Sequence, residues 1–185
     1  MTDDELRLAL REHAYLEGDF VLRSGRRSRY YLDKYRFETR PELLGALGER
    51  IAQAVEEFEP AAVRLAGPEL GAVALAAAAS LASGLPFVIV RKEAKEYGTS
   101  NRLEGVHHEG ELVCVVEDVV TSGGALLESV EALREANLTV RTAICVVDRE
   151  EGGADALDRH GVKLRAIFGA SELLDAAKRP AKPHG

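Results

Sequence analysis

The hydrophobic and polar positions of this chain show a helical period first, and then helical and strand-like segments alternate. From Pro41 to Glu59 the apolar residues recur every three or four positions, which predicts an amphipathic helix with Thr39 and Pro41 as its start signals. After this helix, short continuous apolar runs, typical of buried strands, alternate with helical segments. Strands are expected over residues 61–67, 86–92, 111–118, 139–148 and 163–170, and helices over 71–84, 125–137, 154–160 and 171–178.

This alternation predicts an α/β fold, in which a mainly parallel sheet is flanked by helices on both faces. A chain of 185 residues suits a single domain over residues 1–185, with residues 61–170 as its α/β core. Residues 1–40 break the alternation and are expected to form a small N-terminal hood over the sheet. Ligands of such sheets bind beyond the carboxyl ends of the strands, so we expect the functional residues at that edge.

One long segment has no hydrophobic period. Residues 93–110 hold three glycines and many charged residues. A loop of this length inside a compact domain is usually a lid, a binding loop or a disordered segment. We therefore expect this loop to have a function.

Composition and charge narrow the function classes. The formal net charge is −7, whereas proteins that bind nucleic acid or membrane surfaces need a basic face, so neither partner is expected. No apolar run is long enough to span a bilayer and the first residues are charged, so we expect a cytoplasmic protein. Cys114 and Cys145 lie within apolar strand-like runs and are expected to be reduced core residues.

The clearest motif is VCVVEDVVTSGGALLESV, in which a buried strand ends in two carboxylates and a turn of small residues leads into a helix. Successive amides from Thr121 to Ala125 and the positive end of the helix would cradle an anion, and Gly123 and Gly124 would let a phosphate approach closely. Glu117 and Asp118 would suit the vicinal hydroxyls of a ribose. The motif thus describes a ribose 5-phosphate site, although the turn alone could be an ordinary strand-to-helix turn. A Walker A lysine and a GxGxxG pattern are absent, which argues against the common nucleoside triphosphate and dinucleotide sites.

Three further segments bring positive charge to this acidic chain. FVLRSGRRSRYYLDKYRF is the most basic of them. RKEAK spans the end of a strand and the start of the long loop, and VVDREEGG carries Arg149 just after the end of a strand. Each segment also has a simpler interpretation: a solvated basic hairpin, a solvated charged loop and a surface turn at Asp148 and Arg149.

In order and spacing, these segments resemble the orotate phosphoribosyltransferases, which have the type I phosphoribosyltransferase fold, over about residues 18–170. VEDVVTSGG resembles their phosphoribosyl pyrophosphate motif, and the segment from Glu69 to Ala72 resembles their pyrophosphate loop. The resemblance implies transfer of ribose 5-phosphate from phosphoribosyl pyrophosphate to orotate, giving orotidine 5'-monophosphate and pyrophosphate in pyrimidine biosynthesis. It also implies Mg²⁺ held mainly by the substrate, with Glu117 or Asp118 as the candidate protein ligand.

The same resemblance assigns roles to individual residues. Lys95 would be the catalytic residue of a mobile loop over residues 93–110, which closes over pyrophosphate in the neighbouring active site of a homodimer. Arg91, Lys92 and Asp118 would also be catalytic. The residues expected to bind phosphoribosyl pyrophosphate are Arg23, Arg91, Lys92, Lys95, Tyr97, Glu117, Asp118, Val119, Val120, Thr121, Ser122, Gly123, Gly124 and Ala125. Those expected to bind orotate are Arg23, Tyr31, Leu32, Thr121 and Arg149, the last through its planar bidentate donor group.

Two alternatives stay open. A phosphoribosyltransferase that uses a purine or another pyrimidine would share most of these residues, although the Arg23 segment and Arg149 favour an acidic base. A non-catalytic regulator that senses phosphoribosyl pyrophosphate would keep the cradle but would have no use for Arg91, Lys92 and Lys95.

Overall fold

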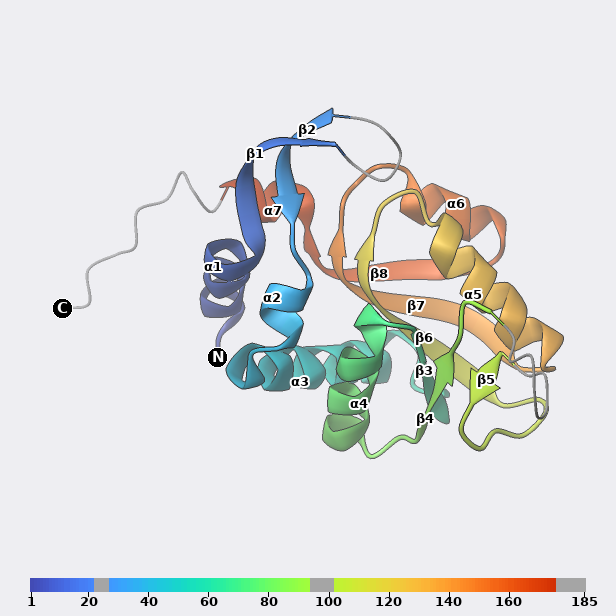
Figure 1. The fold of residues 1–185 in the computed structure, drawn as a ribbon. Helices are drawn as coiled ribbons and strands as arrows, with labels where there is room; N and C mark the ends of the chain where they lie inside the picture. The colour runs from blue at the N-terminus through green and yellow to red at the C-terminus, as the bar shows by residue number, and fades with distance from the viewer. Residues whose placement is uncertain (22–26, 94–101, 176–185) are drawn as a thin grey trace.

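The computed structural model describes residues 1–21, 27–93 and 102–175, and a six-stranded sheet lies at its centre (Figure 1). The strand order is β5-β4-β3-β6-β7-β8. Five of these strands run parallel to one another: β3 (Arg64–Pro68), β4 (Phe87–Val90), β6 (Leu112–Val120), β7 (Thr139–Asp148) and β8 (Lys163–Gly169). At one edge, β5 (Leu103–Glu104) is antiparallel to β4. The predicted α/β fold with a mainly parallel sheet is confirmed.

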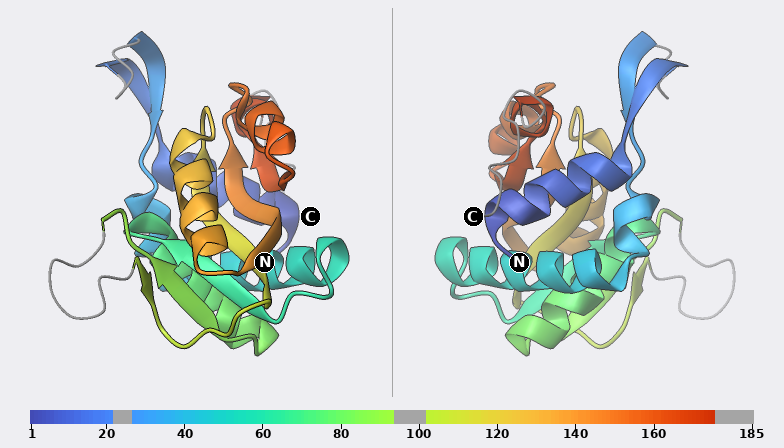
Figure 2. Two further views of the ribbon diagram at one scale, coloured as in Figure 1. Left: turned by 90° about the vertical axis from the view of Figure 1, so that its right-hand side faces the viewer. Right: turned by 90° about the vertical axis from the view of Figure 1, so that its left-hand side faces the viewer.

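Helices cover both faces of this sheet (Figure 2). On one face lie α1 (Asp3–Ala14), α3 (Pro41–Phe58) and α4 (Gly71–Ser83), and on the other lie α5 (Gly124–Glu135) and α6 (Gly153–Arg159). Each face has its own buried apolar cluster, with Ile51 and Leu75 in the first and Leu126 and Leu133 in the second. The sheet is thus packed from both sides, which holds the carboxyl ends of its strands in place. Within the described ranges, no helix combines the length and apolarity needed to cross a bilayer.

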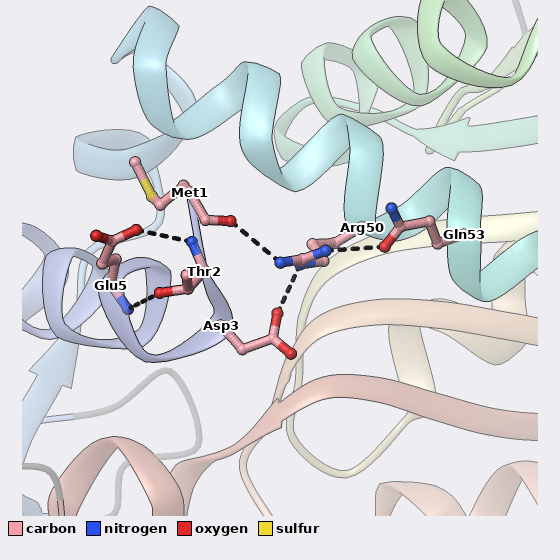
Figure 3. Close-up of polar contacts among 6 residues, drawn as sticks. All are labelled: Met1, Thr2, Asp3, Glu5, Arg50 and Gln53. Carbon is pink, nitrogen blue, oxygen red and sulfur yellow. Dashed lines mark hydrogen bonds and ion pairs between the residues drawn. The ribbon is translucent and has the colours of Figure 1, made fainter.

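The N-terminal segment, predicted to be a small hood over the sheet, consists of a helix, an antiparallel hairpin and a short second helix. After α1 come the antiparallel strands β1 (Tyr15–Val21) and β2 (Arg27–Leu32), which extend beyond the body of the molecule, and the short helix α2 (Tyr35–Glu38) (Figures 1 and 2). A capping box begins α1, because Thr2 and Glu5 each accept a hydrogen bond from the other's backbone amide. Arg50 of α3 ties this start to the body: its Nε lies 2.6 Å from Asp3 Oδ1, and its Nη2 donates to the carbonyl of Met1 (Figure 3).

Two details differ from the sequence-based expectation. Thr39 does not start α3: its hydroxyl donates to the carbonyl of Tyr35 and closes α2, while Arg40 is the N-cap and Pro41 stands in the first turn of α3. The segment 93–110, expected to have no regular structure, contains β5. A strand of two residues is too short for a hydrophobic period to reveal.

Both cysteines lie in the central strands. Cys114 on β6 and Cys145 on β7 are free and fully buried, as predicted. Burial raises the pKa of the Cys114 thiol to about 12, so this group stays protonated at neutral pH. The two residues therefore act as small core side chains.

Candidate active site at the carboxyl edge of the sheet

The turn between β6 and α5 lies at the carboxyl edge of the sheet, where the neighbouring strands β3 and β7 also end (Figure 1). Ser122, Gly124 and Ala125 are exposed on this turn. In the part of the chain that the structure describes, the amides of Ser122 and Gly123 donate to no backbone carbonyl. The first amides of α5 are also unpaired within the helix, as at every helix start. Unpaired amides at the positive end of a helix are an arrangement that binds phosphate.

Glycines give this turn its shape. Gly123 has a φ of 82°, a conformation that L side chains rarely adopt. Gly153, at the start of α6, packs against the turn, since a Cβ there would lie 2.7 Å from the carbonyl oxygen of Thr121. At Gly124, by contrast, an added Cβ would meet only Ser122 Oγ, at 4.0 Å. The turn is therefore supported by α6 and open at Gly124.

The two carboxylates before the turn have different surroundings. The Asp118 side chain is 4% exposed: its Oδ2 lies 2.6 Å from Lys34 Nζ, and its Oδ1 accepts from the Val119 amide at 2.5 Å. Glu117 is only partly buried, and its Oε1 accepts from the Asp118 amide at 3.0 Å. Desolvation by the surrounding protein and the nearby Asp118 charge raise the pKa of Glu117 above its usual range. Glu117 is thus the more accessible of the two predicted ribose acceptors.

Lys34, just before α2, and Glu38, the last residue of α2, join this cluster although the sequence did not identify them as site residues. Glu38 is 4% exposed, and among the described residues its Oε1 has no hydrogen-bond partner. Burial, followed by the charge of Asp118, raises the pKa of Glu38 to about 8. The only sequence signal for Lys34 was its place in the basic segment, and Glu38 gave none.

The predicted pyrophosphate loop is held against the end of β4. Glu69 Oε1 accepts from the Lys92 amide at 2.7 Å, and the Glu69 amide donates to the carbonyl of Val90 at 2.8 Å. Arg91 lies between two carboxylates, with its Nε 3.8 Å from Glu69 Oε2 and its Nη1 3.4 Å from Glu104 Oε1. The structure therefore places the predicted basic residues Arg91 and Lys92 beside this loop.

Arg149 follows β7 and faces the hairpin of β1 and β2. Its guanidinium group lies 4.9 Å from the ring centroid of Tyr30, which in turn stacks on Tyr15 at 5.4 Å. Its Nε is 3.2 Å from a carboxylate oxygen of Glu151, and the Arg149 side chain is 8% exposed. The aromatic residue that meets Arg149 is therefore Tyr30, which the sequence reasoning missed.

Of the other predicted orotate-binding residues, Thr121 lies on the turn after β6, and Tyr31 and Leu32 lie on β2. Tyr31 is 43% exposed, and its ring lies 5.6 Å from that of Phe20. Leu32 packs against the core cluster that α3 and α4 share. Arg23, Lys95 and Tyr97, predicted to bind the substrates, lie outside the described residues.

The sequence and the fold are both similar to those of known proteins. A family model described as the phosphoribosyl transferase domain matches residues 36–168. The orotate phosphoribosyltransferase of Methanocella arvoryzae is 54% identical over 85% of this chain and 88% of its own length, and that of Halobacterium salinarum is 49% identical over 95% of this chain and 98% of its own length. This chain belongs to the orotate phosphoribosyltransferase family.

Solved structures of orotate phosphoribosyltransferases confirm the predicted type I fold. The enzyme from Aeropyrum pernix is 34% identical with a TM-score of 0.82, covering 96% of this chain and 98% of that one. The Mycobacterium tuberculosis enzyme in complex with phosphoribosyl pyrophosphate is 28% identical with a TM-score of 0.78, covering 92% and 98%. An adenine phosphoribosyltransferase from Leishmania donovani, at 16% identity and a TM-score of 0.72, covers 100% and 87% and shares the fold alone. The fold is thus shared by enzymes named for two different bases, whereas the relatives at 54% and 49% identity are orotate enzymes.

Proposed function

We propose that the chain transfers ribose 5-phosphate from phosphoribosyl pyrophosphate to orotate, giving orotidine 5'-monophosphate and pyrophosphate in pyrimidine biosynthesis. The observation that carries the proposal is the turn of unpaired amides after β6, which lies beside Glu117 and Asp118. The amides from Thr121 to Ala125 would hold the 5-phosphate, with the preceding Val119 and Val120 fixing the turn. The two carboxylates would accept hydrogen bonds from the ribose hydroxyls.

Arg149 would bind the carboxylate of orotate. A guanidinium group matches a carboxylate with two parallel hydrogen bonds, and stacking on Tyr30 restricts its orientation. Tyr31, Leu32 and Thr121 would complete the orotate site. This arrangement would favour an acidic base over a neutral one.

The reaction needs no covalent nucleophile. The ring oxygen of the ribose can support an oxocarbenium-like transition state, so the protein has to position both substrates and to neutralise charge on the departing pyrophosphate. Arg91, Lys92 and Lys95 would supply that positive charge, with the amides of the Glu69–Ala72 loop beside them. Lys95 would act as the catalytic residue, and Asp118 would orient the ribose.

Mg²⁺ would reach the site with phosphoribosyl pyrophosphate. Asp118 Oδ2 already pairs with Lys34, and Glu117 is the partly exposed carboxylate of the pair. These donors fit a Mg²⁺ ion that the substrate's own oxygens mainly hold, with Glu117 as the candidate protein ligand. When bound, the ion would neutralise part of the pyrophosphate charge.

We also propose that the enzyme acts in the cytoplasm as a homodimer, in which the loop over residues 93–110 serves the neighbouring active site. Arg91 and Lys92 come directly before this loop, and both contact Glu69 of the pyrophosphate loop. Their position supports a loop that begins beside the pyrophosphate site. Exchange between subunits is implied by the family resemblance of RKEAK.

A panel of bases tests the proposed reaction. Purified protein with Mg²⁺ and phosphoribosyl pyrophosphate should release pyrophosphate with orotate and form orotidine 5'-monophosphate. Uracil, adenine and hypoxanthine should give little or no release, because they lack the carboxylate that Arg149 would bind. Release with adenine or hypoxanthine and none with orotate would overturn the proposal.

A further inference from the structure

Lys34 lies where the N-terminal segment and the pyrophosphate loop meet the carboxylates that are proposed to bind the ribose. It precedes α2, and its Nζ is 2.6 Å from Oδ2 of Asp118 on β6. Gly71 belongs to the predicted pyrophosphate loop, and a Cβ added there would lie 2.7 Å from Lys34 Nζ and 1.9 Å from Asp118 Oδ2. The ammonium group is therefore packed between both halves of the proposed phosphoribosyl pyrophosphate site.

Within this ion pair, Lys34 is the partner that solvent can reach. Its side chain is 33% exposed, compared with 4% for Asp118. Besides Asp118, its ammonium group lies 5.5 Å from the ring centroid of Tyr35. Burial alone would lower the pKa of Lys34, but the charge and hydrogen bond of Asp118 outweigh it and raise this pKa. An ammonium group has three donors, so a charged donor is available to an anionic substrate.

The surroundings of Lys34 are acidic, which creates a need for its charge. Glu38 and Glu117 lie in the same cluster as Asp118 and contribute to the raised pKa of Lys34. The charged carboxylate of Asp118 suits the hydroxyls of a ribose but would repel the pyrophosphate attached to the same sugar. The ammonium group of Lys34, which lies between Asp118 and the pyrophosphate loop, offsets this repulsion.

We propose that Lys34 is a further substrate-binding residue, whose ammonium group keeps its contact with Asp118 and binds a pyrophosphate oxygen of phosphoribosyl pyrophosphate. The inference rests on the proposed function, because it takes Asp118 to lie at the ribose and the Glu69–Ala72 loop to lie at the pyrophosphate. It differs from a purely structural ion pair, which would only hold α2 against β6. It gives the N-terminal segment a direct part in binding the leaving group.

Substitutions of Lys34 test the inference through a selective loss of affinity. Lys34→Met should raise the KM for phosphoribosyl pyrophosphate about 10- to 100-fold, as expected for loss of a charged hydrogen bond. Calorimetric titration with pyrophosphate and Mg²⁺ should show the same loss, whereas the affinity for ribose 5-phosphate and the KM for orotate should stay unchanged. Lys34→Arg, which keeps the charge, should restore most of the affinity.

Two further variants serve as controls. In Lys34→Gln the side chain can still donate a hydrogen bond to Asp118 but carries no charge. This variant should show the same selective loss of affinity for phosphoribosyl pyrophosphate, and it serves as the test if Lys34→Met does not fold. Arg36, two residues along, is paired with Asp33 at 3.5 Å and is 52% exposed, and Arg36→Met should behave like the wild type. An unchanged KM for phosphoribosyl pyrophosphate in the Met or Gln variant, or an equal loss for pyrophosphate and ribose 5-phosphate, would overturn the inference. Since the wild type is assayed with orotate in parallel, its inactivity would count against the proposed function instead.

Discussion

At the residue scale, the site combines buried carboxyl groups that cannot all be charged together. Glu38 faces Asp118 of β6, and Lys34 and Asp33 lie near it at the start of α2. Burial and the charge of Asp118 favour a neutral Glu38, whose pKa is raised to about 8. At neutral pH, Lys34 and Asp118 can then form a charge pair beside a neutral acid. The pair keeps the local charge low before the anionic substrate binds.

The raised pKa of Glu38 predicts a dependence of stability on pH. Between its ordinary value of 4.5 and about 8, the folded state holds a proton that the unfolded state has lost, so the contribution of Glu38 to stability decreases as pH rises through this window. Glu38→Gln removes this titration. The variant should therefore become more stable relative to the wild type as pH rises. The difference between their free energies of unfolding should increase by up to about 1.4 kcal/mol per pH unit across the window.

Urea denaturation at several pH values between 5 and 8 would measure this difference. Glu56→Gln, at an exposed position of α3, is the matched control and should follow the wild type at every pH. Parallel curves for wild type and Glu38→Gln would show that Glu38 is already ionised in the folded protein.

Residue contacts across the site are what the sequence predicts least well. Along β2, Tyr30 and Leu32 are partly buried and share one face, whereas Tyr31 is exposed on the other. Which face meets Arg149 depends on how the hairpin is set against the sheet, and no local pattern contains that information. The Lys34 to Asp118 contact likewise spans 84 positions of sequence.

At the element scale, close packing of α3 on α4 fixes the helix that begins in the pyrophosphate loop. Gly48 of α3 makes this approach possible, because a Cβ there would lie 2.7 Å from the backbone carbonyl carbon of Ala78 on α4. At Gly45, one turn earlier on the same helix, an added Cβ would have nothing within 4 Å. There is therefore no room for a side chain at Gly48, whereas Gly45 can accept one.

Alanine substitutions at these two positions should change stability in opposite directions. Gly48→Ala should lower the free energy of unfolding by about 1–3 kcal/mol, because the backbones of α3 and α4 would have to move apart. Gly45→Ala should raise it by about 0.5–1 kcal/mol through better helix propensity. Thermal or urea unfolding of both variants would test the pair. A stable Gly48→Ala protein would mean that α3 and α4 do not pack as closely as described.

Elements with a long hydrophobic period were predicted well. The strand expected over residues 139–148 is β7 (Thr139–Asp148), and the helix expected from Pro41 to Glu59 differs from α3 by its last residue. The order of strands could not be predicted, because it depends on pairing between distant segments. The two-residue β5 and the four-residue α2 carry too few positions to show a period.

At the scale of the whole molecule, an acidic chain concentrates positive charge at one edge of its sheet. The net charge is −7, yet Lys34, Arg91, Lys92 and Arg149 all lie around the ends of β3, β4, β6 and β7. The sequence predicted that the candidate residues gather at this edge, because the carboxyl ends of parallel strands meet at one side of the sheet. It could not show how the N-terminal segment reaches that edge, which is a matter of tertiary packing.

Mixing two inactive variants would test the proposed exchange of loops. Lys95→Ala should lower kcat about 10²- to 10³-fold, because the leaving group loses a charged donor. Asp118→Asn should be impaired at the ribose. If the loop acts in the neighbouring site, each mixed dimer has one intact site, and an equal mixture should recover about a quarter of wild-type activity. A mixture as inactive as its components would place the loop in its own subunit's site.

The central claim is that the turn after β6 binds the 5-phosphate, and Gly124→Ala tests it most directly. The added Cβ would meet only Ser122 Oγ, at 4.0 Å, so the fold should be unaffected, but the methyl group would lie where the phosphate has to approach. Calorimetric titration of phosphoribosyl pyrophosphate with Mg²⁺ should show affinity weakened about tenfold or more, with an unchanged melting temperature. Wild-type affinity in a folded Gly124→Ala protein would contradict the claim.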